Sequence, residues 1–324
     1  MAEQNKREIK EGTNKVTVVG TLVEKNFEDK SYTNSTTGET VEKIVGTLSV
    51  RTGENEVHQI RLESNKLTKL GKENGLYKGY VTVRDQYVSV ADVAEAAKNG
   101  QELVADEVSV NGELTTNEYY GQDGKLRQFQ QIKGKFVNRL RETDDKTPRA
   151  QFEIDIFVDK VRPEIKDEDE TGRAIVEGLV PTFNSIFPYT FTVIPEGSDF
   201  FLNDLQRGQT LKVYGNILNV KKEHVKTVES AFGQPIEETS YTYVSESLIN
   251  NAKVPYDEDS ANAFNPEGIK ERLAKREVYL EQQKSRNNSG GGQQADNRPN
   301  AFGGAPTNSA PKKNDIPVDV SNLF

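Results

Sequence analysis

The sequence predicts a mainly β protein built from two small closed barrels in tandem, followed by a C-terminal helix and a disordered tail. Three observations lead to this prediction. Stretches rich in β-branched residues alternate with turn residues as far as residue 252, and a glycine recurs inside these stretches. After residue 285 the composition becomes rich in Gly, Asn and Gln. A length of 324 residues suits about two domains and a tail.

The first block of predicted strands begins at residue 14. Strands are expected at NKVTVVGTLVEKNF (14–27), EKIVGTLSVRTG (42–53), EVHQIRLES (56–64) and GYVTVRDQYVSV (79–90). VADVAEAAKNG (90–100) is expected to form a short helix that ends near Gly100. DEVSVNGELTTNEYY and RQFQQIKGKFVNRL then predict a long hairpin around the turn GQDGK (121–125).

A polar stretch, RETDDKTPRA (141–150), predicts a boundary before the second block. Strands are expected at 151–161, 174–183, 188–194, 210–223 and 239–248, and the acidic KDEDETG (166–172) is expected to be a solvated loop. A helix is predicted over 266–285 because Ile269, Leu273, Arg276 and Leu280 share one face.

A recurring glycine pattern favours closed barrels over open sheets. It occurs as VVGTL (18–22), IVGTL (44–48), VNGEL (110–114), VEGLV (176–180) and VYGNI (213–217). Glycine within a strand marks a bulge or sharp bend, and small barrels need such bends to close. Three copies in the first block and two in the second predict two similar barrels of the OB-fold type. The alternative is another coiled antiparallel sheet, such as a sandwich.

These observations divide the chain into six segments. The prediction is a flexible arm (1–14), an OB-fold-like domain (15–146), a second OB-like β domain (147–252), a connector with a helix (253–285), a disordered linker (286–314) and a C-terminal docking tip (315–324).

Composition excludes several classes of protein and site. The chain has no Cys and only two His, so we expect no disulfide, no metal site and no cofactor. It has no apolar run of membrane-spanning length, and its N-terminus lacks the apolar core of a secretory signal, so a cytoplasmic protein is expected. The net charge of -9 argues against nucleic acid, but residues 1–146 contribute only -2 and contain basic clusters.

The strongest basic cluster is KLRQFQQIKGKFVNRLR (125–141), which has a local charge of +6 and no acid. Phe129 and Phe136 interleave with the cations, and Tyr119 and Tyr120 stand across the predicted turn. Strand alternation places Arg127, Phe129 and Gln131 on one face, which Lys133 and Lys135 continue. Cations that track a phosphate backbone beside rings that stack on bases indicate a site for single strands. The alternative is a solvated basic hairpin whose Phe side chains fill a core.

A second basic cluster, residues 60–84, carries a net charge of +4 and includes tyrosines. Together the clusters predict these nucleic-acid-binding residues: Arg61, Lys66, Lys69, Lys72, Tyr77, Lys78, Tyr80, Arg84, Tyr119, Tyr120, Lys125, Arg127, Phe129, Lys133, Lys135 and Arg139.

No catalytic pattern stands out, and we predict that the protein is not an enzyme. Glu153, Asp155 and Asp159 are interpreted as surface acids on an edge strand rather than as a nuclease metal site. No phosphate-binding glycine loop, nucleophile elbow or HExxH motif is present.

The layout resembles single-stranded DNA-binding proteins of the bacterial and bacteriophage OB-fold type. VTVVGTLVEKNF resembles their first barrel strand, GGGQQADNRPNAFGGAP their linker, and DIPVDVSNLF their acidic tip ending in Phe. The resemblance implies that the tip recruits replication and repair proteins through Asp315, Ile316, Pro317, Asp319 and Phe324, and we expect Leu323 to be a further apolar anchor. The double length, the lack of Trp and only two acids in the tip depart from the family's pattern. A phage-encoded protein, which would act in the host cytoplasm, fits these departures better than a protein of the bacterial host itself.

The leading hypothesis is therefore a non-catalytic protein that coats and protects single-stranded DNA in replication, recombination and repair. It would bind single-stranded DNA and recruit replication and recombination proteins through its tip, and self-association is left open. The alternative is a structural or assembly protein of a virion, built from two β-barrels. A third hypothesis is a nuclease or recombinase accessory enzyme that uses the acids of 153–159.

Overall fold

A computed structural model of the chain describes residues 11–34, 38–121, 123–183, 185–228, 232 and 236–289. Strand residues (56%) far outnumber helical residues (20%), and a helix follows the last strand, so the prediction of a mainly β fold with a C-terminal helix is confirmed.

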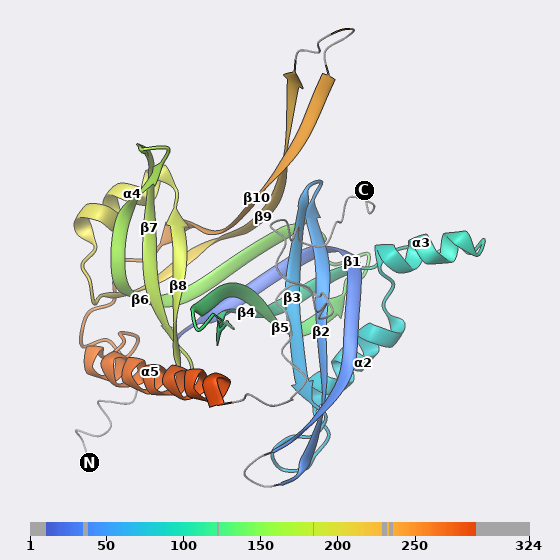
Figure 1. Ribbon diagram of the computed structural model, residues 1–324, viewed down its shortest axis with the longest axis horizontal. Coiled ribbons are helices and arrows are strands. Elements are labelled where there is room, and N and C mark those ends of the chain that lie inside the picture. Colours follow the sequence, from blue (N-terminus) through green and yellow to red (C-terminus); the bar gives the residue numbers. More distant parts are fainter. Residues whose placement is uncertain are drawn as a thin grey trace. The chain divides into compact units, whose positions relative to one another are not determined.

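The first five strands close into a barrel (Figure 1). They are β1 (Asn14–Thr33), β2 (Thr40–Gly53), β3 (Glu56–Asn65), β4 (Glu107–Tyr120) and β5 (Leu126–Arg139). β1 pairs with β2 and β4, and β2 pairs with β3, all antiparallel. β3 pairs in parallel with β5, and β5 neighbours β4, so the strands close in the order 1-2-3-5-4-1.

The next five strands repeat this topology. They are β6 (Arg149–Lys166), β7 (Asp169–Pro181), β8 (Ile186–Val193), β9 (Thr210–Val228) and β10 (Ile236–Ala252). β6 pairs with β7 and β9, β7 with β8, and β9 with β10, all antiparallel. β8 pairs in parallel with β10, which gives the order 6-7-8-10-9-6. Each barrel therefore has the strand order and the strand-three-to-strand-five closure of a Greek-key OB-fold.

Some of the predicted glycines stand where the backbone of a neighbouring strand approaches closely. A Cβ on Gly20 would lie 2.0 Å from the carbonyl oxygen of Arg51, and one on Gly215 would lie 2.0 Å from that of Leu248. Real Cβ atoms do not come so near a carbonyl, so only glycine fits at these points. Because such contacts recur in both barrels, the glycine pattern was a sound signal of barrel closure.

Helices α2 (Gly75–Gln86) and α3 (Val90–Lys98) join β3 to β4. The prediction of a strand over 79–90 is wrong, because this segment forms most of α2. The side chain of Asn74 caps the helix by accepting the Leu76 N–H, and Tyr80 and Val83 are buried. Leu76, Tyr80 and Val83 follow helical spacing and pack on the barrel core, which outweighs the strand propensity of Val81, Thr82 and Val83.

The predicted helix over 90–100 is α3, and its N-terminus has a capping box formed by Ser89 and Asp92. In the second barrel, α4 (Pro195–Asp199) and the π-helical turn η1 (Phe200–Asp204) occupy the corresponding position between β8 and β9.

The C-terminal helix, α5 (Pro266–Ser289), confirms the helix predicted over 266–285. Ile269 lies in a small apolar cluster with Phe157, Leu179 and Phe264, and Leu273 packs against that cluster. Leu280, on the same predicted face, is also buried.

The acidic segment 166–172 is exposed to solvent, as predicted, but it forms a tight hairpin rather than a loop. Lys166 pairs with Asp169, so only Asp167 and Glu168 form the turn between β6 and β7. Both have positive φ, 51° and 72°, as a type I′ turn requires. Non-glycine residues adopt this conformation at some cost in free energy.

Strand pairing also connects the two barrels. β1 pairs with β6 from Asn14↔Ile154 to Val19↔Arg149, and Glu56 at the start of β3 pairs with Val220 of β9. The described residues form two compact units, one drawn from residues 1–116 and 130–276 and the other from residues 117–129 and 277–324. The first unit thus contains most of both barrels, and the second contains the end of the β4–β5 hairpin and the later part of α5. Among the described helices, none has the length and apolar character needed to cross a membrane.

Candidate nucleic-acid interface

The outer face of β3 and β5 carries the cations that the sequence singled out. On β5, Lys133 and Lys135 are exposed, whereas Ile132 and Gly134, which alternate with them, are buried. The parallel pairing of β3 with β5 sets Arg61 opposite Lys133, and buried Ile60 opposite buried Ile132. Arg61 and Lys133 therefore lie side by side on the outside of the first barrel, although 72 residues separate them in the sequence.

An open hollow of about 410 Å³ lies beside this pair. Its walls come from the end of β3, the segment before α2, and β5, and include Glu63, Asn65, Leu67, Lys69, Asn74 and Lys133. Lys69 and Lys133 thus reach the same depression from two parts of the chain. Of the second basic cluster, Lys66, Lys69 and Lys72 lie in an irregular segment rather than on a helix.

The predicted cations differ in whether a carboxylate already holds them. Within the described part of the chain, no acid lies within ion-pairing distance of Lys69, Lys72, Lys125 or Lys133. The others pair at these distances: Arg61 with Glu63 at 3.5 Å, Lys66 with Glu42 at 2.6 Å, Arg84 with Asp29 at 2.8 Å, Arg127 with Asp123 at 3.6 Å, Lys135 with Glu113 at 2.6 Å, and Arg139 with Asp106 at 2.9 Å. Lys78 also pairs with Glu73. Surface ion pairs of this kind contribute about 0–1 kcal/mol to stability, so a phosphate can displace the carboxylate and bind such a cation. The unpaired lysines can bind a phosphate without breaking an ion pair.

Glu63 sets the local balance of charge on β3. Burial disfavours its ionised form, but hydrogen bonds and charges from Lys43 and Arg61 outweigh burial and lower the pKa of its carboxyl group. Lys43 donates to it at 2.7 Å. Glu63 therefore stays ionised at neutral pH and offsets part of the charge of Arg61, which leaves Lys69 and Lys133 as the main uncompensated charges around the hollow.

The predicted contact of Tyr80 with DNA is wrong because its ring on α2 packs into the barrel core, whereas that of Tyr77, also on α2, stays a prediction. Tyr80 is 2% exposed, and its hydroxyl donates to the carbonyl oxygens of Gly134 and Lys135, both at 3.1 Å. Burial raises the pKa of this hydroxyl to about 12. Tyr80 therefore supports β5 from beneath and cannot stack on a base. Tyr77 is half-buried against the same core, with its hydroxyl 3.4 Å from Asp29.

Phe136 lies within the basic cluster 125–141 but is not among the predicted site residues. Its ring is 59% exposed on β5, next to Lys135. No described ring stacks on it, so its face can accept a base. Arg139, by contrast, is held in place, because its guanidinium lies 4.6 Å from the centroid of the Tyr87 ring and its side chain donates to the carbonyl oxygen of Gln86.

The end of the β4–β5 hairpin belongs to the second unit and has its own contacts. Tyr119 and Phe129 stack on each other, with ring centroids 5.8 Å apart and planes 16° apart. The ammonium of Lys284 lies 5.7 Å from the ring centroid of Tyr120. Three of the predicted stacking residues are thus in contact with other side chains of their own unit, while Lys125 is exposed.

The acids of β6 do not form a nuclease-like cluster. β6 is a central strand rather than an edge strand, since it pairs with β1, β7 and β9, and Asp155 is buried rather than on the surface. Asp155 accepts hydrogen bonds from the Thr13 N–H at 2.7 Å and from the Tyr256 hydroxyl at 3.1 Å. Glu153 pairs with Lys212 at 2.7 Å, and Asp159 pairs with Arg207 at 2.7 Å. Among the described residues, no group of three or more His, Cys, Asp or Glu is placed to hold a metal ion.

Two OB-fold barrels, the first with unpaired lysines on its outer face, define a tandem OB-fold protein with a candidate surface for a polyanion. The model of the YorF family matches residues 12–286, so the chain belongs to the YorF family. No curated protein matches the sequence. Similar solved structures include the crystal structure of a deletion mutant of the single-stranded DNA-binding protein from Thermus aquaticus. That similarity has 12% identity and a TM-score of 0.42, and it covers 78% of this chain and 98% of that chain.

The predicted linker (286–314) lies almost wholly outside the described residues, and the docking tip wholly so. The tip residues Asp315, Ile316, Pro317, Asp319, Leu323 and Phe324 therefore remain predictions.

Proposed function

We propose that the protein binds single-stranded DNA without sequence preference, and that the outer face of β3 and β5 in the first barrel is the main contact surface. One observation carries this proposal: Arg61 and Lys133 lie side by side, next to a hollow that Lys69 also lines. Three cations from three parts of the chain converge there, and two of them have no described acidic partner.

The chemistry of this surface suits a sugar–phosphate backbone. Unpaired ammonium groups displace the counterions of phosphates, and the exposed ring of Phe136 offers a face for a base. OB-folds bind oligonucleotides on the face of their second and third strands, and β3 is the third strand of this barrel. The net charge of -9 does not prevent binding, because salt screens charges over about 8 Å at physiological ionic strength and the local surface dominates contact.

The cellular role belongs to the same proposal. We infer that the protein coats single-stranded DNA in replication, recombination and repair, that it does no chemistry on the DNA, and that it acts in the cytoplasm, the host's if a phage encodes it. The tip Asp315–Phe324 would recruit replication and recombination proteins. The resemblance of the tail supports recruitment, and the separate ion pairs of Glu153 and Asp159 support a structural role for those acids.

Fluorescence anisotropy with labelled oligo-dT of about 30 nucleotides, at low and at high salt, tests the proposal. We expect binding at low salt that weakens as salt rises, with equal affinity for mixed sequences of the same length. No binding at low salt would remove the proposal. Metal-dependent cleavage of the labelled strand that Asp155→Asn abolishes would contradict the non-catalytic part.

A further inference from the structure

The second barrel has a projecting ribbon that the proposed site does not use. β9 and β10 pair with each other from Val213↔Ala252 to Val228↔Ile236. Their contacts with β6 and β8 end at Asn216 and at Leu248, respectively. Beyond Val220, the two strands run on together as a ribbon that leaves the barrel, and Figure 1 shows it projecting past the other strands.

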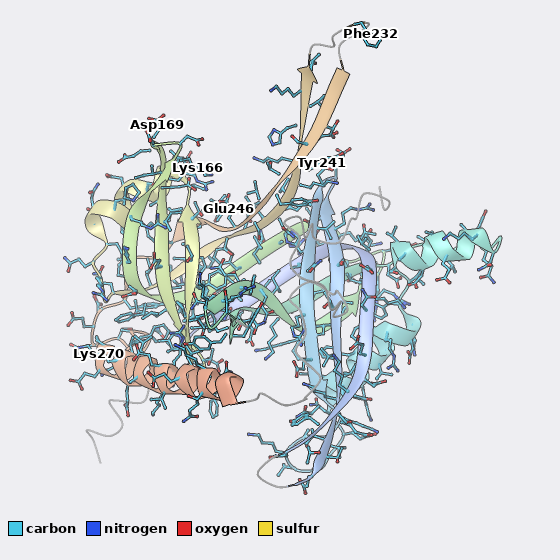
Figure 2. The ribbon with its side chains drawn as sticks, viewed as in Figure 1. Lys166, Asp169, Phe232, Tyr241, Glu246 and Lys270 are labelled. Carbon is cyan, nitrogen blue, oxygen red and sulfur yellow. The ribbon has the colours of Figure 1, made fainter. Side chains whose placement is uncertain are left out.

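One face of this ribbon is aromatic and exposed. The register places Lys221 opposite Tyr243 and Glu223 opposite Tyr241, so these four side chains share a face with Val225. Tyr241 and Tyr243 are 48% and 53% exposed, and Val225 is 56% exposed. Figure 2 shows Tyr241 along the ribbon, away from the barrel. Exposed rings in a row have no role in the core of either barrel.

Cations accompany these rings. The ammonium of Lys221 lies 4.0 Å from the centroid of the Tyr241 ring. Lys222 points to the opposite face and is exposed. Rings that share a face with Lys221, Glu223 and small hydroxyl side chains suit stacking on bases better than they suit a continuous apolar protein surface.

The root of the ribbon is attached to the first barrel. The Lys221 N–H donates to the carbonyl oxygen of Asn55 at 2.9 Å, and the Asn219 side chain donates to that of Val57 at 2.5 Å. Asn55 belongs to the turn between β2 and β3, so the ribbon starts at one end of β3. The hollow with Lys69 and Lys133 lies at the other end, beside Glu63 to Asn65.

β3 therefore joins the two surfaces. Gln59, Arg61 and Glu63 alternate with buried residues and face outward between the hollow and the ribbon root. Seven residues separate Glu56 from Glu63, which is about 23 Å at the usual strand rise of about 3.3 Å per residue. A strand of DNA that follows the outer side of β3 away from the hollow arrives at Asn219 and Lys221.

We propose that the β9–β10 ribbon is a second contact surface for the same single strand. Bases stack on Tyr241 and Tyr243, and Lys221, on the same face, contacts a phosphate. This inference rests on the proposed function, because it assumes that the first barrel binds single-stranded DNA. It extends the bound length from one barrel to both.

Anisotropy with the full-length chain and two labelled oligo-dT probes tests the ribbon separately. A probe of about 10 nucleotides fits one OB-fold, and a probe of about 40 nucleotides is long enough for both barrels. We expect the double substitution Tyr241→Ala with Tyr243→Ala to weaken binding of the long probe at least about 10-fold, while the short probe binds as it does to the wild type. Tyr241→Phe with Tyr243→Phe keeps both rings and should bind like the wild type.

Tyr279→Ala is the matched control, since Tyr279 is 58% exposed on α5 and lies outside both surfaces. Circular dichroism confirms that each variant is folded. If the wild type binds both probes and the double alanine variant binds them equally well, the ribbon inference is wrong and the proposed function stands. If the wild type binds neither probe, the proposed function fails and the inference with it. Unchanged affinity with loss of self-association in sedimentation would make the ribbon a protein-contact surface and also overturn the inference.

Discussion

Lys133→Glu is the change that tests the candidate surface most selectively. Lys133 is exposed, has no described acidic partner and lines the hollow, so its replacement breaks no ion pair and should leave the fold intact. The substitution also puts a carboxylate beside Arg61, the residue opposite Lys133 on β3. Lys133→Glu therefore removes one cation from the surface and gives a second cation, Arg61, a carboxylate to pair with.

The size of the effect follows from the contact it removes. An ammonium and a phosphate about 4 Å apart in water attract by about 1 kcal/mol, so reversing the charge changes binding by about 2 kcal/mol. This corresponds to about 30-fold weaker binding at low salt. Each phosphate contact to a single strand also contributes about 0.7 to the slope of log affinity against log salt, and Lys133→Gln should lower the slope by about that amount.

Anisotropy titrations at several salt concentrations measure both quantities. Lys160→Glu is the matched control, because Lys160 is exposed on β6 and its reversal changes the net charge by the same amount. If Lys160→Glu weakens binding as much as Lys133→Glu, only net charge matters. An unchanged affinity in Lys133→Glu would refute the placement of the surface on β3 and β5.

Three further predictions concern the framework of the two barrels. Tyr80→Phe removes the hydroxyl that donates to the carbonyl oxygens of Gly134 and Lys135, so the free energy of unfolding in denaturant melts should fall by about 1 kcal/mol. DNA affinity should stay unchanged. A loss of affinity in a variant as stable as the wild type would show that Tyr80 contacts DNA. Glu168→Gly relieves a positive φ and should stabilise the protein by about 1 kcal/mol, whereas a lower melting temperature would disprove strain in that turn. Burial opposes ionisation of Glu164, but Arg173 and Thr171 outweigh it and lower its pKa to about 2. Ionised Glu164 stabilises the fold above its unfolded pKa of about 4.5, and this stabilisation is lost as the pH falls toward 2. Arg173→Met should therefore make the free energy of unfolding depend less on pH between about 4.5 and 2. An unchanged pH dependence would contradict the role of Arg173.

Sequence alone predicted the framework of the molecule because strand alternation and glycine bends are local signals. The ten strands, the C-terminal helix and the tandem barrels were accessible from these patterns. Helix α2 was missed because Val81, Thr82 and Val83 have the composition of a strand, and its N-cap, Asn74, stands in a loop with several other polar residues. The burial of Tyr80 depends on that helix and could not be seen without it.

The candidate site was predicted only in part, for a physical reason. Residue types and strand alternation placed Lys133 and Lys135 on one outward face, as found. The proximity of Arg61 to Lys133 results from the parallel closure of β3 on β5, a pairing between distant segments. The aromatic ribbon was missed because Tyr241 and Tyr243 lie in an acidic half of the chain, and their exposure follows from β9 and β10 extending past their barrel.

Lysine footprinting tests the central claim most directly, because the claim is that the face of the first barrel contacts the single strand. The full-length chain is acetylated with and without saturating oligo-dT, and mass spectrometry compares the modification of each lysine. Bound DNA should protect Lys69 and Lys133 and leave Lys160 reactive. Equal acetylation of Lys69 and Lys133 with and without bound DNA would contradict it.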